Sequence, residues 1–161
     1  MLSLDGEHRI EPLLHTRFRE RNAEIAPDGR WIAYQSNESG VDQVYVQPFP
    51  GVDAGRWQVS SAGGVKPLWA PSGRELFYLA SGGALMSVPI QPGPAFTFGN
   101  PTRLLDTSAF ANPGAPGRNW DVAPDGQRFL IIKGAEQPQI APQINVVLNW
   151  QEELKRLVPT P

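Results

Sequence analysis

Short apolar runs recur along this chain, and three of them follow the same kind of turn-forming tetrapeptide. The tetrapeptide reads Ala-Pro-Asp-Gly or Ala-Pro-Ser-Gly and begins at Ala26, Ala70 and Ala123. In such a turn proline fixes φ at the first central position, Asp or Ser bonds the local backbone, and glycine takes the left-handed position. The pattern therefore predicts a tight link between two antiparallel strands at each of these three places.

Each tetrapeptide is followed by a run of mainly apolar residues, at 31–34, 76–79 and 129–132. The first two prolines, at positions 27 and 71, are 44 residues apart, and the next two, at 71 and 124, are 53 apart. Strand-rich repeats of roughly 40–50 residues are typical of propeller blades of about four strands each. We therefore expect an all-β fold, an antiparallel β-propeller segment of about three blades.

The alternation of apolar and polar positions divides the chain into these blades. The expected units are an outer half-blade at 1–20 with a strand from Arg9 to His15, blades at 21–60 and 61–107, an incomplete blade at 118–149, and a terminal helix at 150–158. The expected strands of the blades are 22–26, 31–36, 43–47 and 56–60, then 65–69, 75–79, 85–90 and 101–106, then 119–123, 128–133 and 144–148. The helix is predicted by a capping box at its start, with Asn149 as N-cap and Glu152 three residues later.

Composition narrows the classes of function that the chain can have. The 161 residues include 40% hydrophobic residues, enough for a real core, while 17 Pro and 16 Gly separate many short strands. The formal net charge of −2 is spread along the chain, so nothing predicts nucleic acid or direct membrane insertion. We expect no signal peptide and no transmembrane segment, because the opening lacks a basic region and no run approaches the ~18–20 apolar residues of a membrane helix.

Four stretches carry a resemblance to a known family. They are Ala-Pro-Asp-Gly-Arg-Trp-Ile-Ala-Tyr at 26–34, Ser-Asn-Glu-Ser-Gly at 36–40, Gly-Arg-Glu-Leu-Phe-Tyr at 73–78 and Pro-Asp-Gly-Gln-Arg-Phe-Leu at 124–130. With them the chain resembles the TolB-like, WD-repeat-like β-propeller family over about residues 20–150. The resemblance implies a six-bladed ring that binds a protein or a ligand, of which this chain supplies about three blades.

The closing stretch 146–157 looks like the end of a bacterial subgroup of this family, in which the propeller often follows a serine/threonine protein kinase domain. That resemblance allows a periplasmic or extracytoplasmic location as part of a longer protein. It also offers an alternative function, the accessory or sensor propeller of a bacterial serine/threonine protein kinase or of a prolyl-oligopeptidase-type hydrolase. This chain carries none of the kinase signature motifs.

Residues for catalysis are scarce. The only imidazoles are His8 and His15, and solvated strand-end positions suit both better than a role as general base. There is no Gly-x-Ser-x-Gly nucleophile elbow, and with no Cys and two His a transition-metal site is not expected. We therefore expect no enzyme activity, no metal and no cofactor, and a non-catalytic module for protein or ligand binding.

In an antiparallel blade, alternate connections between strands lie on the same face, and this determines the face on which binding is expected. Turns of the Pro-Asp/Ser-Gly kind share one face and are too tight to offer much surface, whereas longer polar loops share the other. The residues expected there at the channel mouth are Arg21, Asn22, Lys66, Arg118, Asn119 and Trp120, with Asn37 and Glu38 further out. The cationic centre favours an anionic or carboxylate-bearing partner, such as a peptide C-terminus. The alternative is that these are ordinary solvated loops.

Two further expectations concern the Trp residues and the open ring. Trp120, beside the long loop, is the one tryptophan that we expect to stack on a ligand, and the other four are expected to fill the space between blades.

Three blades cannot close a ring of the usual four to eight. We therefore expect a homodimer, with about six blades, or missing blades supplied by a longer chain.

Overall fold

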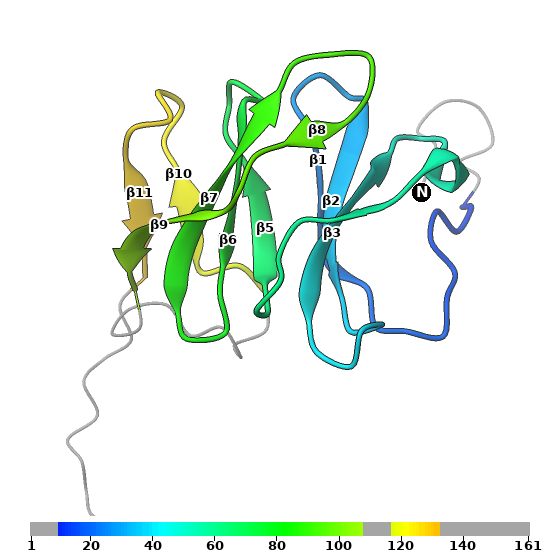
Figure 1. The fold of residues 1–161 in the computed structure, drawn as a ribbon, viewed down its shortest axis with the longest axis horizontal. Coiled ribbons are helices and arrows are strands. Elements are labelled where there is room, and N and C mark those ends of the chain that lie inside the picture. Colours follow the sequence, from blue (N-terminus) through cyan, green and yellow to red (C-terminus); the bar gives the residue numbers. More distant parts are fainter. Residues whose placement is uncertain (1–9, 108–116, 133–161) are drawn as a thin grey trace, which may run out of the picture.

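The computed structural model describes residues 10–107 and 117–132, and over these residues the chain is all-β. Its strands form antiparallel sheets, and the only helix in the described part is the short 3-10 helix η1 (Val52–Ala54). Three sheets stand side by side in the order of the sequence (Figure 1). We call them sheet 1, sheet 2 and sheet 3.

Each sheet begins with two strands that are joined by one of the repeated turns. Sheet 1 consists of β1 (Arg21–Ile25), β2 (Trp31–Ser36), β3 (Gln43–Pro48) and β4 (Trp57–Gln58). Sheet 2 consists of β5 (Val65–Trp69), β6 (Glu75–Leu79) and β7 (Ala84–Gln91), with β8 (Thr97–Phe98) and β9 (Thr102–Asp106) both paired to β7. Sheet 3 consists of β10 (Trp120–Val122) and β11 (Phe129–Ile131).

The three turns have the same geometry. The turn glycines Gly29, Gly73 and Gly126 have φ values of 70°, 68° and 71°. In each turn the glycine N–H donates to the carbonyl oxygen of the alanine three residues earlier, at 2.8 Å. All three turns lie on one edge of the array, and the loops β2–β3 and β6–β7 lie on the other (Figure 1). The predicted strand links are therefore confirmed, and we call these two edges the turn face and the loop face.

A cluster of aromatic rings joins sheets 1 and 2. Phe96, which lies between β7 and β8, is buried and packs against Trp31 at 5.2 Å and Trp57 at 5.3 Å between ring centroids. It also meets Trp69 of β5 at 6.4 Å and Phe98 at 5.5 Å. Arg30 adds a polar contact across the same boundary, because its guanidinium donates to the carbonyl oxygen of Gly93 at 3.2 Å.

A second, smaller core joins sheets 2 and 3. Phe77 and Leu79 of β6 are buried there together with Leu85 of β7. From sheet 3, Trp120 and Phe129 pack against them, and the rings of Phe77 and Phe129 meet edge to face at 5.0 Å. Sheet 2 thus has both of its faces covered by another sheet.

The structure differs from the sequence expectation at three places. Residues 10–15, the described part of the expected strand from Arg9 to His15, form no strand and contain only an isolated bridge at Ile10. The expected strand 101–106 is preceded by an additional short strand, β8, so the fourth position of sheet 2 is split in two. The expected fourth strand of sheet 1 contains only Trp57 and Gln58. The expected strand 144–148 and terminal helix 150–158 lie outside the described residues.

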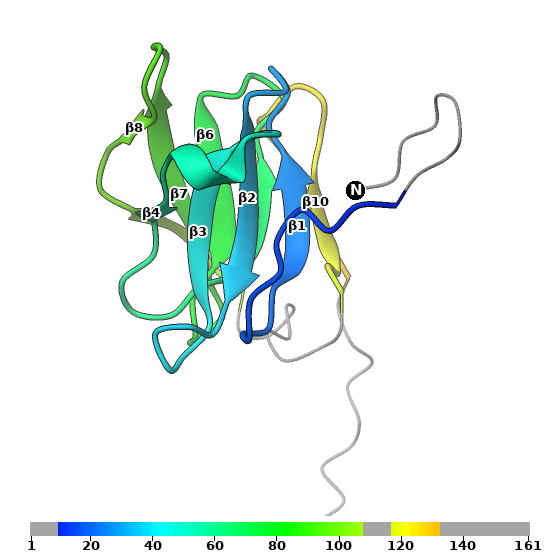
Figure 2. The same cartoon turned by 90° about the vertical axis from the view of Figure 1, so that its right-hand side faces the viewer.

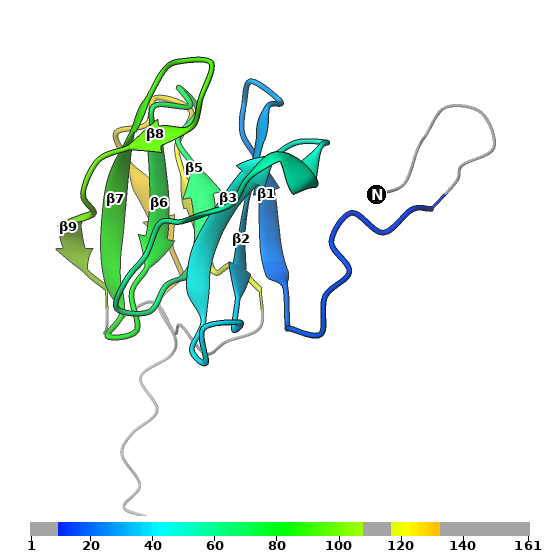
Figure 3. The same cartoon turned by 45° about the vertical axis from the view of Figure 1, so that its right-hand side comes forward.

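Residues 10–20 run alongside sheet 1 on its side away from sheet 2 (Figures 2 and 3). Side-chain contacts tie this segment to the β2–β3 loop: Asn37 Oδ1 accepts a hydrogen bond from the backbone N–H of Arg19 at 2.8 Å, and Asp42 pairs with the Arg19 guanidinium at 3.0 Å. Within the segment, the Thr16 hydroxyl accepts from the backbone N–H of Phe18 at 3.0 Å, as in a local turn. Local side-chain bonds of this kind compete with the ladder that a strand would need.

The turn geometry predicts the effect of a single methyl group. Gly73→Ala should lower the free energy of unfolding by about 1 kcal/mol, because φ of 68° is disfavoured for a residue with a Cβ although no atom lies close to it except the Pro27 ring at 3.9 Å. The matched control is Gly82→Ala, where φ is not positive and nothing lies within 4 Å. Urea titration should show a loss for Gly73→Ala alone. Equal effects of the two substitutions would contradict the assigned role of the turn.

For a residue of the aromatic cluster we predict a larger loss of unfolding free energy. Phe96→Ala should cost about 3–5 kcal/mol of unfolding free energy, because it empties the space between Trp31, Trp57 and Trp69. Phe98→Ala, at the edge of the same cluster and only partly buried, should cost clearly less. Chemical denaturation measured by tryptophan fluorescence would compare them, and a Phe96→Ala loss below that of Phe98→Ala would be inconsistent with this packing.

Candidate ligand-binding site

The candidate site lies where the first strands of the three sheets begin. Asn22, Lys66 and Asn119 occupy the same place in the repeat, each four residues before the alanine of the following turn. Asn22 and Lys66 have positive φ values of 51° and 56°. Both lie where the pairing of the first strand with the second is irregular, between Arg21 and Glu24 in sheet 1 and between Val65 and Leu68 in sheet 2.

A left-handed backbone is unfavourable for lysine, since only Gly, and sometimes Asn or Asp, adopts it readily. At Lys66 the surrounding structure therefore imposes this conformation, as is common at ligand sites. The irregularity turns the starts of β1 and β5 out of the regular ladder. It thereby places two equivalent side chains, Asn22 and Lys66, at the boundary between neighbouring sheets.

A chain of polar contacts links these equivalent residues across three sheets. Gln35 of β2 is its centre: Gln35 Oε1 accepts from Asn22 Nδ2 at 2.7 Å and from the backbone N–H of Lys66 at 3.1 Å. The Lys66 ammonium in turn donates to Asn119 Oδ1 at 3.4 Å. Three of the eight residues predicted for the site, Asn22, Lys66 and Asn119, are thus brought together.

Lys66 is the largest of the fully buried side chains, with 1% of its surface exposed. Removal from water disfavours the ammonium, so burial lowers the pKa of Lys66 from its ordinary value of 10.5. A buried cation is tolerated where polar groups surround it, and the amide oxygen of Asn119 is one of these groups. The site therefore holds a positive charge in a partly desolvated setting, where its attraction for an anion is stronger than in water.

A side-chain contact also connects the starts of sheets 1 and 3. Arg118, just before β10, forms an ion pair with Glu24 of β1. Glu24 also offers its carbonyl oxygen to the indole N–H of Trp69 on β5, at 3.1 Å. The first strands of all three sheets therefore converge, and the ion pair offsets the charge of Arg118.

Arg21, Asn37, Glu38 and Trp120 do not take part in this chain of polar contacts. Arg21 is exposed, and no ion pair of its guanidinium is present among the described residues. Asn37 holds the backbone of Arg19, and Glu38 pairs with Arg56 at 2.6 Å, so both serve the β2–β3 loop.

Trp120 corrects the expectation of a stacking surface. Only 3% of its surface is exposed, and its ring packs 6.2 Å from that of Phe129. The ring therefore belongs to the core between sheets 2 and 3. Its indole N–H has no hydrogen-bond partner within the described part of the chain.

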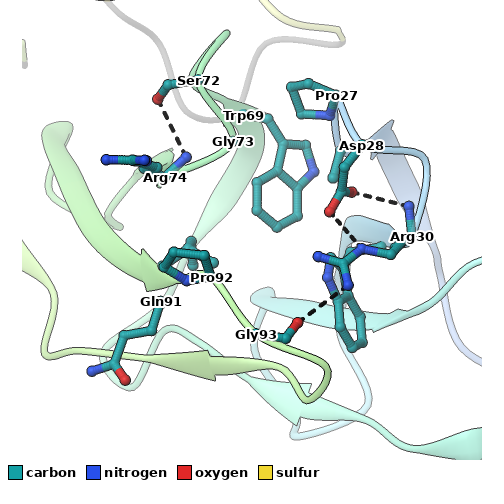
Figure 4. Close-up of a pocket in the computed structure, with 13 residues that line it drawn as sticks. Pro27, Asp28, Arg30, Trp69, Ser72, Gly73, Arg74, Gln91, Pro92 and Gly93 are labelled. Carbon is teal, nitrogen blue, oxygen red and sulfur yellow. Dashed lines mark hydrogen bonds and ion pairs between the residues drawn. The ribbon is translucent and has the colours of Figure 1, made fainter.

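The turn face contains a hollow that the sequence did not indicate. A cavity of about 330 Å³ lies between the first two turns, with the indole of Trp69 beside it (Figure 4). Asp28 and Arg30 bound it as an ion pair at 2.8 Å, and Pro92 lies across from them. The Arg30 guanidinium beside Asp28 helps to lower the pKa of that carboxyl although burial acts in the opposite sense. The hollow depends on residues 90–93 approaching Arg30, and no local pattern signals that approach.

The described residues contain no group of three or more His, Cys, Asp or Glu that can hold a metal ion. No helix in the described residues is both long and apolar enough to cross a membrane. No family model matches the chain, and a comparison with curated proteins finds no match either.

The buried charge of Lys66 predicts a dependence of stability on pH. The folded state holds this proton less tightly than the unfolded chain, so the contribution of Lys66 to stability rises as the pH rises from the lowered pKa towards 10.5. Lys66→Met removes the charge and keeps a long side chain. We expect the unfolding free energy of the wild type to rise relative to that of Lys66→Met over this alkaline range.

Urea titrations at several pH values would measure this difference, in which the titration of the tyrosines cancels. The exposed Arg74→Met serves as control, and its difference from the wild type should stay constant. A constant difference for Lys66→Met as well would show that its pKa is not lowered.

Proposed function

We propose that the chain is a segment of a TolB-like β-propeller, with the three sheets as blades, and that it is a non-catalytic module that binds a protein or a small anionic ligand. The convergence of the first strands supports the propeller arrangement, because blades radiate from a common axis lined by such strands. Three turns of the same geometry on one face support it too, since each blade then has the same direction.

One observation carries the proposed binding function: Lys66 of sheet 2 is buried between amide groups of the two neighbouring sheets. Its ammonium donates to Asn119, and its backbone N–H donates to Gln35, which also accepts from Asn22. Amides and a cation together suit a carboxylate, which accepts several hydrogen bonds at once. Arg21, exposed at the start of β1, adds a second cation at the rim. Arg118 supplies a third where a ligand carboxylate takes the place of Glu24.

A binding experiment can test this proposal with a minimal probe. Isotope-labelled protein would be titrated with N-acetyl-dialanine carrying either a free C-terminal carboxylate or a C-terminal amide. We expect the free acid alone to shift the side-chain amide signals of Asn22, Gln35 and Asn119. The triple variant Arg21→Ala/Lys66→Met/Arg118→Ala should bind the acid at least about tenfold more weakly, because hydrogen bonds to charged groups contribute about 1.5–3 kcal/mol.

The matched control removes two cations from the opposite face, as Arg30→Ala/Arg74→Ala. This control should leave the affinity for the acid unchanged. Equal binding of the acid and the amide, or a loss of affinity confined to the turn-face variant, would overturn the proposed site.

A further inference from the structure

Sheet 3 carries a hollow that begins at the candidate ligand-binding site. The hollow measures about 220 Å³ and is lined by Arg118, Asn119, Trp120, Asp121, Leu130 and Ile132. The first two of these residues were predicted for the candidate site, and the last two are large aliphatic residues on β11 or directly after it. We call this feature the β10–β11 hollow.

The pairing of β10 with β11 explains why aliphatic side chains face solvent in the hollow. Trp120 pairs with Ile131, and both pack against sheet 2. Side chains alternate between the two sides of a strand, so Leu130 and Ile132 point to the side away from sheet 2. They are 72% and 64% exposed, so the described residues leave both of them largely open.

Asn119 joins the apolar wall of the hollow to the buried cation. Its backbone carbonyl oxygen accepts a hydrogen bond from the N–H of Ile132 at 3.0 Å, and its side-chain oxygen accepts one from the Lys66 ammonium at 3.4 Å. A carboxylate that binds at Lys66 and Asn119 therefore has the hollow directly beside it. Arg118, which we propose as a further cation for the same carboxylate, lines the hollow as well.

Asp121 determines which side chains the hollow accepts. It is exposed, and it lies directly opposite Leu130 in the ladder. Its Oδ1 accepts a hydrogen bond from the backbone N–H of Val122 at 2.9 Å, which leaves the negative charge in place. This charge repels a second anionic group in the hollow. An uncharged apolar side chain instead gains by covering Leu130 and Ile132.

We propose that the β10–β11 hollow receives the side chain next to the ligand carboxylate, so that the protein prefers a peptide C-terminus with an aliphatic last residue. The inference rests on the proposed carboxylate site and states which carboxylates that site selects. Whole small-molecule sites usually measure about 300–1,000 Å³, so a hollow of about 220 Å³ suits one side chain of a larger ligand. In a peptide the last side chain and the terminal carboxylate leave the same Cα, so the two can bind at adjoining places together.

Titration of the full chain with three small probes tests the proposal. The probes are N-acetyl-dialanine and N-acetyl-alanyl-leucine as free acids, and the C-terminal amide of the leucine compound. Each buried methylene group strengthens binding about fourfold, so we expect the leucine acid to bind at least about fivefold more tightly than the alanine acid. The leucine amide should bind more weakly than either acid.

Two matched variants locate the preference. Leu130→Ser/Ile132→Ser should make the two acids bind equally, because it removes the aliphatic wall of the hollow. Both side chains are largely exposed, so the fold should tolerate this change. The control Leu104→Ser/Leu105→Ser replaces two aliphatic residues of β9 that are each 48% exposed, and it should keep the wild-type preference for leucine. Circular dichroism would verify that both variants fold.

The wild type gives an independent measurement, because nuclear Overhauser contacts should join the leucine methyl groups of the probe to those of Leu130 and Ile132. Equal binding of the two acids by the wild type, with weaker binding of the amide, would overturn this inference and leave the carboxylate site standing. Acids that bind no better than the amide would overturn the carboxylate site as well.

A preference for leucine that survives in Leu130→Ser/Ile132→Ser would also overturn the inference, since the leucine side chain would then bind elsewhere. A marked loss of folding stability in this variant would do the same, because it would show that residues 133–161 of the same chain cover the hollow.

Discussion

An antiparallel sheet has two faces, and the energetics of this chain follow from how many of those faces are covered. Sheet 2 has a sheet on each side and contains most of the buried aliphatic and aromatic residues of both cores. Sheets 1 and 3 each rely on sheet 2 for one covered face. Burial of apolar surface contributes about 25 cal/mol per Å², so an uncovered apolar face is a large deficit for so small a protein. The dependence of the outer sheets on the central one is therefore the main constraint on the fold.

The elements that the sequence predicted well are those specified by neighbouring residues. The turns at Gly29, Gly73 and Gly126 follow from proline, a small polar residue and glycine in order, and the two strands joined by each turn lie within a residue or two of their expected bounds. Phe96 could not be recognised in the same way, because a Pro- and Gly-rich stretch reads as a connection. Its partners Trp31 and Trp57 are distant in sequence, and only the folded chain brings them together.

The candidate site was predictable as a position and not as a set of contacts. Counting back from each turn gives Asn22, Lys66 and Asn119, which share a place in the repeat. The sequence did not indicate that Gln35 joins them, that Lys66 is buried or that Glu24 pairs with Arg118. Those facts depend on the angle between neighbouring sheets, which tertiary packing determines. Trp120 was misjudged for the same reason, because its exposure depends on how closely sheet 3 approaches sheet 2.

The packing of Phe96 against Trp31 and Trp57 has a consequence for how the protein folds as it is synthesised. Sheet 1 is complete once residue 58 has left the ribosome. Its Trp31 and Trp57 side chains, however, pack against Phe96, which is synthesised much later. The polar link between Arg30 and Gly93 spans 63 residues in the same way. Contacts of such long sequence separation slow folding, since a large loop must close first. A nascent chain halted before Phe96 would therefore present an unfinished aromatic surface, the state in which a chaperone is most needed.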